Sequence, residues 1–410
     1  MWTCDFAGCG KPAVRNLGNC ILCNRHLCSQ HLQYGVHECP KWEVTSPLRG
    51  GIPCSGPPLQ YDRVTRSSVM GGMNYHIEVC FDDGIRWIAR VRRFNATSSP
   101  AVLQNYIVQS EVATFKFLER TGVPAPKLFY FALDNEDNSV VVGYILMEKL
   151  HGKSLRWSLA TQEQRRMMEQ LADVFVELSK YPFDRLGSLH CLNDIHVSAF
   201  ARESLTDFVQ SEMRTMGPFS SLEEYHKSEI RLILDLILRE EIYSQQAVDA
   251  YLIHRFLLDL VPIALSKLVQ DDQRYYLKHA DDKGDHIMVD EDFHITGIID
   301  WEWAHTAPPT HAFNSPIGLL PVAEFYRGTN NLGSNEITFA RILGEKSRPD
   351  LEGLSGTDGF LGLFQGLRDA AKVDDGVDWD GWKSAALYRY REDTGLQLLL
   401  CRHGNLVSEG

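Results

Sequence analysis

The sequence predicts an α+β protein in three consecutive parts: a small metal-binding module, a strand-rich segment with one helix, and a mainly helical segment. Six of the ten cysteines fall within the first 39 residues, a density that indicates metal binding. Apolar and polar residues alternate between Tyr75 and Val91, which is typical of two hairpin strands. After residue 155 the apolar residues recur at helical spacing.

The composition fits a folded protein and argues against two classes of function. The chain has 410 residues, of which 44% are hydrophobic and 23% charged, so it can bury a core. A formal charge of −13 argues against nucleic-acid binding as its main role. No apolar run approaches the roughly 18 residues of a membrane span. The first residues lack the apolar stretch of a secretory signal, so we expect a cytoplasmic protein, with the nucleus also open.

The N-terminal cysteines and two histidines form a set of metal-ligand type. The eight residues are Cys4, Cys9, Cys20, Cys23, Cys28, His31, His37 and Cys39. Eight such ligands suit two tetrahedral zinc ions with four ligands each. About 40 residues cannot bury enough apolar surface to fold alone, so structural zinc would stabilise the module. A small disulfide knot or an unmetallated coil is the alternative, which an intracellular location disfavours.

Residues 3–42 resemble the AN-one-type zinc finger of the stress-associated protein class. The resemblance implies a cross-braced pairing, with His26 left out. One ion would take Cys4, Cys9, Cys28 and His31, and the other would take Cys20, Cys23, His37 and Cys39. It also implies a protein partner of the ubiquitin or proteasome type. Residues 1–42 carry four Lys or Arg and two Asp or Glu, too small an excess to favour nucleic acid.

Residues 43–60 read as a linker rich in Pro, Gly and Ser, and the strand-rich segment at 61–150 follows. Its predicted hairpin strands cover Tyr75–Phe81 and Ile85–Val91. The preceding Gly71-Gly72-Met73-Asn74 would let backbone N–H groups approach a phosphate, although a plain turn has the same chemistry. Two more strands are predicted near Lys127–Leu133 and Val140–Met147.

A helix predicted from about Tyr106 to Arg120 carries a carboxylate on its apolar stripe. Glu111 stands at helical spacing from Ile107 and Phe115. A buried carboxylate needs a cationic partner, and Arg90 in the second hairpin strand is a candidate. In the alternative, the helix is rotated and Glu111 faces solvent.

The segment after residue 150 contains three predicted helices and then two acidic loops. The helices begin near Thr161, Leu222 and Gln246. Residues 276–304 interrupt this pattern with a short hairpin, preceded by His279-x-Asp281 and followed by Asp300-Trp301-Glu302. Hairpin strands can hold two such loops side by side, so we expect Asp281 and Asp300 to converge. Paired carboxylates of this kind suit magnesium nucleotide chemistry.

From about residue 60 to 330 the sequence resembles the aminoglycoside phosphotransferase family, which is related to choline kinases and to protein kinases. The similar segments are ITGIIDWEWA, SEVATFKFLERTGVPAPK and Leu186-Gly187-Ser188-Leu189, as in the fungal-type branch. The resemblance implies a bilobal protein-kinase-like fold, with lobes at 61–150 and 151–410 and ATP between them. By motif match, Asp281 would orient the acceptor hydroxyl and Asp300 would bind Mg²⁺. Nucleotide contacts would come from Gly71, Gly72, Asn74, Arg90, Glu111, Glu148 and Leu150.

Three positions depart from the family pattern. Where the family has a metal-binding asparagine, five residues after the catalytic aspartate, this sequence has His286. Imidazole is a poor ligand for Mg²⁺, so the metal could instead be Mn²⁺. Neighbouring Asp285 could also replace His286 as the ligand. The phosphate-contacting lysine is Arg90, which can hold phosphates through two hydrogen bonds. Asp282 and Asp285 add negative charge beside the expected triphosphate.

Two functions follow from these motifs. In the first, the protein transfers the γ-phosphate of ATP to a hydroxyl of a small molecule. In the second, the kinase-like fold is inactive and serves as a binding module, with the zinc finger contacting a protein. The presence of Asp281 and Asp300 favours the phosphotransferase, whereas His286 in place of the asparagine favours the inactive fold.

Overall fold

A computed structural model describes most of the chain beyond residue 72. The described residues are 73–93, 98–135, 138, 140, 142–157, 161–191, 194–207, 210, 212–267, 274–281, 284–321, 332–346, 348–355 and 379–403. The predicted zinc finger, the linker, Gly71, Gly72 and Asp282 lie outside these residues.

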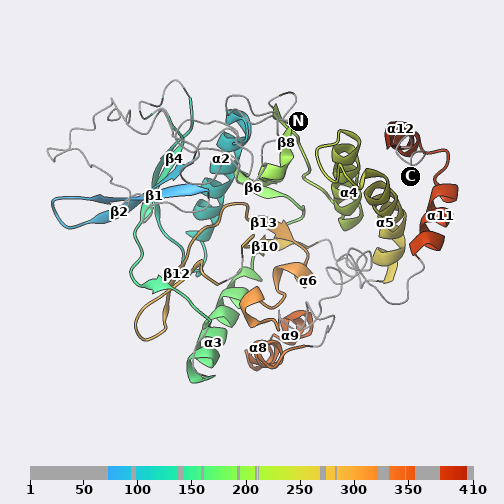
Figure 1. The fold of residues 1–410 in the computed structure, drawn as a ribbon. Coiled ribbons are helices and arrows are strands. Elements are labelled where there is room, and N and C mark those ends of the chain that lie inside the picture. The colour runs from blue at the N-terminus through green and yellow to red at the C-terminus, as the bar shows by residue number, and fades with distance from the viewer. Residues whose placement is uncertain are drawn as a thin grey trace, which may run out of the picture.

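The first lobe (residues 73–148) is an antiparallel sheet with one helix against it (Figure 1). The strand order is β1-β2-β4-β3. The strands are β1 (Asn74–Cys80), β2 (Arg86–Arg92), β3 (Leu128–Ala132) and β4 (Tyr144–Glu148). The alternating pattern predicted the hairpin of β1 and β2 correctly, and Gly84, with φ of 84°, supplies the left-handed residue of its turn. The fourth strand begins four residues later than predicted.

Helix α2 (Ala101–Leu118) lies between the two lobes and begins five residues earlier than predicted. Pro100 immediately precedes it, and the fixed φ of proline suits a helix start. Leu103 and Ile107 pack into a cluster with Phe200 and other residues of the second lobe. Farther along, Val112 and Phe115 enter the main core. The helix is therefore held from both sides, and its orientation is fixed by packing.

The second lobe (residues 153–403) mixes helices with short paired strands, more strand than the predicted mainly helical segment. Its strands are β5 (Lys153–Ser154), β6 (Ser188–Cys191), β7 (Ile195–Ser198), β8 (Thr206–Asp207), β9 (Glu212–Met213), β10 (Tyr276–Lys278), β11 (Ile287–Val289), β12 (Ile295–Ile298) and β13 (His305–Ala307). Its helices are α3 (Thr161–Leu178), η1 (Glu203–Leu205), α4 (Leu222–Leu238), α5 (Ala247–Lys267), α6 (Pro309–Ala312), η2 (Ile317–Leu319), α8 (Ser334–Glu345), α9 (Pro349–Ser355), α11 (Trp379–Arg389) and α12 (Thr394–His403).

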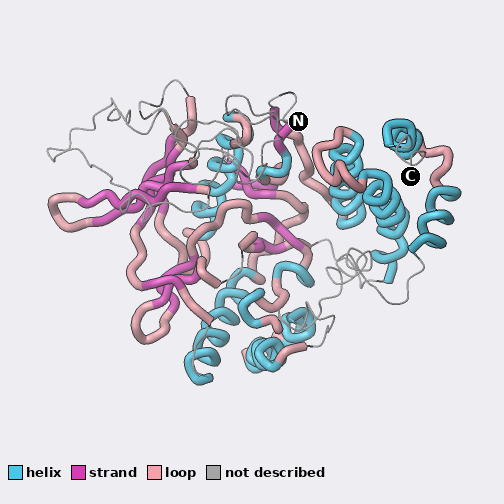
Figure 2. The backbone as a smooth tube through the Cα atoms, in the orientation of Figure 1, coloured by secondary structure: helices cyan, strands magenta, loops and turns pink. Residues whose placement is uncertain are grey.

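In Figure 2 the helices α4, α5, α11 and α12 lie at the right, on the side away from the strands of the first lobe. Helices α4, α5, α11 and α12 form a separate helical cluster with its own apolar core. Its buried residues include Ile237, Leu252 and Leu396. None of the helices in the described ranges is long and apolar enough to cross a membrane.

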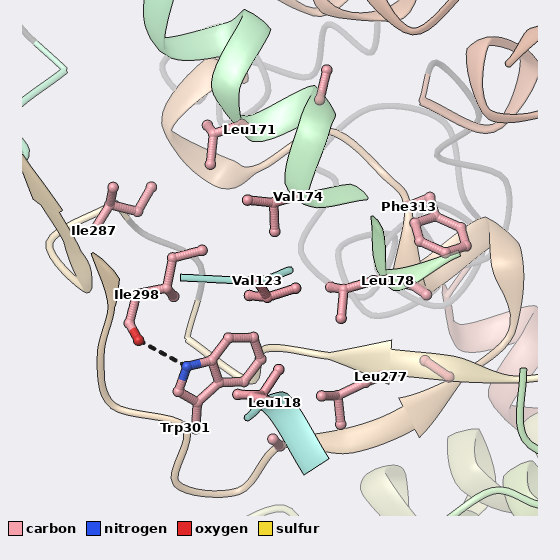
Figure 3. Close-up of a cluster of buried hydrophobic side chains, with 14 of the residues drawn as sticks. Leu118, Val123, Leu171, Val174, Leu178, Leu277, Ile287, Ile298, Trp301 and Phe313 are labelled. Carbon is pink, nitrogen blue, oxygen red and sulfur yellow. Dashed lines mark hydrogen bonds between the residues drawn. The ribbon is translucent and has the colours of Figure 1, made fainter. Parts of the chain in front are cut away.

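One apolar core runs through both lobes and reaches the acidic loops. Leu118 and Val123 from the first lobe meet Leu171, Leu277 and Ile287 of the second (Figure 3). Trp301 is fully buried in this core, and its indole N–H donates a hydrogen bond of 2.8 Å to the Ile298 carbonyl (Figure 3). Burial of these side chains stabilises the loop after β12, and it also stabilises the contact between the two lobes.

Candidate active site

Arg90 is the centre of the candidate site. It lies on β2 opposite Ile145 of β4, and its side chain is only 4% exposed. Its Nη1 donates to the Glu111 carboxylate of α2. Its Nη2 donates to Asp300 Oδ1 at 2.5 Å and to Glu302 Oε2 at 2.7 Å. The predicted Arg90–Glu111 pair is therefore present, and the alternative of a solvated Glu111 is wrong.

Arg92 extends the same network two residues along β2. Because side chains two apart on a strand share a face, it points the same way as Arg90. It forms ion pairs with Glu302 and with Glu203 of η1. Burial and, less strongly, repulsion from Arg90 lower the pKa of Arg92 to about 10 against the opposing attraction of Asp300, so the guanidinium stays charged at neutral pH.

The sequence prediction missed Arg92, Glu203 and Glu302 as members of this site. Two signals were available: the Arg-x-Arg spacing on one strand, and the Asp-x-Glu spacing after β12. The two arginines face four carboxylates, from Glu111, Asp300, Glu302 and Glu203, so the network has two negative charges in excess. A divalent cation would balance that excess.

Asp300 is the most solvent-exposed carboxylate of the network. Its side chain is 48% exposed, and its backbone φ of 63° lies in the left-handed region, which is uncommon for a residue with a Cβ. Mg²⁺ prefers carboxylate, phosphate and water oxygens, so this half-exposed carboxylate is a suitable ligand. Among the described residues, no group of three or more His, Cys, Asp or Glu side chains is arranged to hold a metal by itself. A magnesium ion here would need oxygens from a nucleotide or from water.

His279 connects the loop of Asp281 with the loop of Asp300. The Asp281 backbone N–H donates to His279 Nδ1 at 3.2 Å, so the ring proton is on Nε2. His279 Nε2 lies 2.9 Å from the Ile299 carbonyl, one residue before Asp300, and donates to it. The two loops are thus joined by one buried imidazole, and the convergence of the Asp281 and Asp300 carboxylates stays a prediction.

His286 is placed differently from a magnesium ligand. Its ring stacks on His279 with the centroids 4.1 Å apart, and its Nδ1 accepts the Gly284 backbone N–H at 3.3 Å. Burial lowers the pKa of His286 to about 2, with contributions from His279 and Lys278, so it is neutral at physiological pH. The side chain supports the shape of the loop, and we do not propose it as a metal ligand. Asp285, the suggested substitute, is exposed.

Gly284 shows how closely that loop is packed. Its φ is 104°, and a Cβ added there would lie 2.0 Å from Trp157 Nε1. Trp157 also packs against Gly318, where an added Cβ would lie 1.9 Å from the same indole nitrogen. Any larger residue at 284 would therefore displace the indole or the loop.

The other residues predicted to contact nucleotide lie around this network. Asn74 at the start of β1 is buried, and its amide donates to Glu302 Oε2 at 2.9 Å. Glu148 ends β4, and its carboxylate accepts the Lys127 backbone N–H at 3.2 Å. Leu150 packs on Gly297, where an added Cβ would lie 2.3 Å from Leu150 Cδ1. Glu148 and Leu150 thus lie on the connection between the lobes, and their predicted contact with nucleotide stays a prediction.

Two surface hollows lie elsewhere, beside the start of α4. They measure about 600 and 240 Å³ and share Phe219, Ser228 and Arg231 in their linings. Neither lining includes the carboxylates of the acidic loops.

Solved structures similar to this chain include several phosphotransferases. An ethanolamine kinase of Plasmodium vivax aligns over 78% of this chain and 80% of that one, with 13% identity and a TM-score of 0.45. A thermostable mutant of aminoglycoside phosphotransferase APH(4)-Ia, in ternary complex with AMP-PNP and hygromycin B, aligns over 80% and 92%, with 15% identity and a TM-score of 0.37.

Curated relatives match shorter stretches. A subtelomeric hrmA-associated cluster protein of Aspergillus fumigatus is 32% identical over 169 residues, which are 40% of this chain and 31% of that protein. Altered inheritance of mitochondria protein 9 of Komagataella phaffii is 34% identical over 101 residues, or 22% and 16% of the two chains. The matched region thus spans about a third or less of these relatives.

The family comparison covers most of the candidate site. Residues 81–315 match the model of the phosphotransferase enzyme family, and this range contains Arg90, Glu111, Asp281 and Asp300. The match extends over more than half of the 410 residues. The chain therefore belongs to the phosphotransferase enzyme family, with its kinase-like fold.

Proposed function

We propose that this protein transfers the γ-phosphate of ATP to a hydroxyl group of a small molecule. One observation carries the proposal: a buried guanidinium joins strand β2, helix α2 and the Asp300 loop, and His279 ties that loop to Asp281. A cation and two carboxylate loops held together are what phosphoryl transfer requires, because catalysis there depends on positioning and charge stabilisation.

Each side chain has a distinct part in this mechanism. Asp281 orients the acceptor hydroxyl and accepts its proton as the phosphoryl group transfers. Arg90 and Arg92 bring two fixed positive charges to the side of the phosphates, with Glu111 holding Arg90 in place. Asp300 is the residue that would hold Mg²⁺, which when bound neutralises charge on the phosphate oxygens. Because helix α2 holds Glu111 between the lobes, Arg90 is already in position before the substrate binds.

An inactive kinase-like fold is the second candidate. It is favoured by His286, which stacks on His279 where the family has an asparagine, and by the ion pair that already engages Asp300. The test is Mg²⁺-dependent ATP binding by the full chain, followed by transfer of labelled γ-phosphate to small hydroxylated compounds. Binding with no transfer to any acceptor or to water would favour the inactive fold.

For the N-terminal module we propose a structural zinc finger that binds two zinc ions and contacts a protein partner. The support is the set of eight cysteine and histidine ligands between positions 4 and 39. Metal analysis of the full chain, purified without chelators, is expected to find two zinc ions per molecule. Replacing Cys20 and Cys23 by Ser should remove one of them. Finding one zinc or none in the wild type would contradict the cross-braced arrangement.

A further inference from the structure

Glu302 is the residue through which the two lobes hold each other. It is on the second lobe, and its side chain is 5% exposed. Its Oε2 accepts hydrogen bonds from Arg90 Nη2 at 2.7 Å and from Asn74 Nδ2 at 2.9 Å. Its Oε1 accepts from Arg92 Nη1. All three donors belong to β1 and β2 of the first lobe, so one carboxylate gathers both strands of the hairpin.

The loop that carries Glu302 is held in the second lobe by the packing of its neighbouring residues. Trp301, its neighbour, is buried in the common core and hydrogen-bonded to the Ile298 carbonyl (Figure 3). Asp300 and Trp303, on either side, both have φ of 63°. Left-handed backbone is uncommon for a residue as bulky as Trp303, and it persists where the surroundings enforce it. The turn therefore directs Trp301 into the core and Glu302 toward the first lobe.

The contacts of Glu302 distinguish it from a metal ligand. Both of its oxygens already accept N–H groups, and the side chain is nearly inaccessible, whereas Asp300 is half exposed. A metal at Glu302 would have to displace two arginines and an amide. Because a buried carboxylate without its partners is costly, those contacts define its role.

We propose that Glu302 is a positioning residue, a latch that holds β1 and β2 over the Asp300 loop and keeps Arg90 and Arg92 side by side. The inference deepens the proposed function, since the two arginines are assigned there to the phosphates. The latch itself is a property of the folded protein and can be measured with no turnover. Removing it should loosen the hairpin of the first lobe first, because the rest of that lobe is held by α2.

The test compares Glu302→Gln with Glu203→Gln in the full chain. Glutamine keeps the size of the side chain and removes the charge. Glu203 pairs with Arg92 in the same network and is 31% exposed. In the described part of the chain, Arg90 and Asn74 donate to Glu302 and not to Glu203. For Glu302→Gln we expect amide hydrogen exchange over residues 74–92 to accelerate about tenfold or more, with α12 unchanged. For Glu203→Gln the same segment should change by less than about threefold.

Binding measurements separate the latch from a metal-ligand role. With Glu302→Gln, affinity for ADP in EDTA should fall about tenfold, while the Mg²⁺ concentration for half-maximal ATP binding stays within about twofold. Unchanged exchange over 74–92, or a raised Mg²⁺ requirement with unchanged metal-free ADP affinity, would overturn the proposal. If the variant does not fold, Asn74→Ala, which removes one of the three donors, should give a smaller acceleration in the same segment, and no acceleration there would also overturn it. If the wild type binds no nucleotide, the proposed function fails while the exchange data still decide on the latch.

Discussion

Replacing Asp281 by Asn is expected to lower kcat for phosphoryl transfer by about 10²- to 10⁴-fold, the range typical of a lost general base. Asparagine has nearly the same shape, and the backbone N–H of residue 281 can still donate to His279 Nδ1, so the loop should keep its form. The amide cannot accept the proton of the acceptor hydroxyl. The affinity for Mg·ATP should therefore stay within about threefold, and the effect should appear in kcat.

The matched control is Asp292→Asn, on the turn between β11 and β12. Asp292 is exposed, and removing its charge should change kcat by less than about threefold. Turnover is best followed as loss of labelled γ-phosphate from ATP, which also detects transfer to water. Equal activity of Asp281→Asn and the wild type would show that Asp281 is not the base.

Replacing Arg90 by Met is expected to destabilise the protein by about 3–5 kcal/mol, because it removes the cation that pairs with buried Glu111 and one of the two cations that pair with buried Glu302. Glu111 and Glu302 are both nearly inaccessible and cannot be rehydrated without opening the lobe interface. The loss should be visible in equilibrium urea unfolding followed by circular dichroism, and the first lobe should lose hydrogen-exchange protection first.

Arg86→Met provides the comparison on the same strand. Arg86 is 60% exposed and pairs with Glu78 at 2.9 Å, so losing this surface pair should cost no more than about 1 kcal/mol. If both substitutions cost the same, the Arg90 network does not stabilise the fold as its burial implies. Methionine is used at both positions so that the apolar stem of the side chain is kept.

Local sequence patterns predicted much of the fold, since strand alternation and helical stripes depend only on neighbouring residues. The β1–β2 hairpin and the β11–β12 hairpin lie where the alternation and the turn residues indicated. Helix α2 was predicted too short because its start follows Pro100 and its first turn packs through Leu103 on the second lobe, a contact between distant segments. Strand β5 has only two residues and exists because it pairs with β11, so it has no signal of its own.

The site was predictable only in part. Arg90 and Glu111 could be paired because a buried carboxylate on a helix stripe demands a cation. Glu302 joins residues more than 200 positions away, and no local pattern shows that Arg92 and Asn74 turn toward it. His286 looked like a departure in a metal site, whereas the structure stacks it on His279, a contact that depends on the packing of two loops.

The most direct test of the phosphotransferase site is the thermal stability of the full chain with ATP, compared between the wild type and Asp300→Ala. ATP at 100 times its Kd would stabilise the wild type by about 2.7 kcal/mol, and the Tm should rise by a few degrees more when Mg²⁺ or Mn²⁺ is present than in EDTA. In Asp300→Ala that metal-dependent rise should be lost, because the half-exposed carboxylate is the proposed ligand. A wild type that shows no shift with either metal, or a variant that shifts as much as the wild type, would contradict the account.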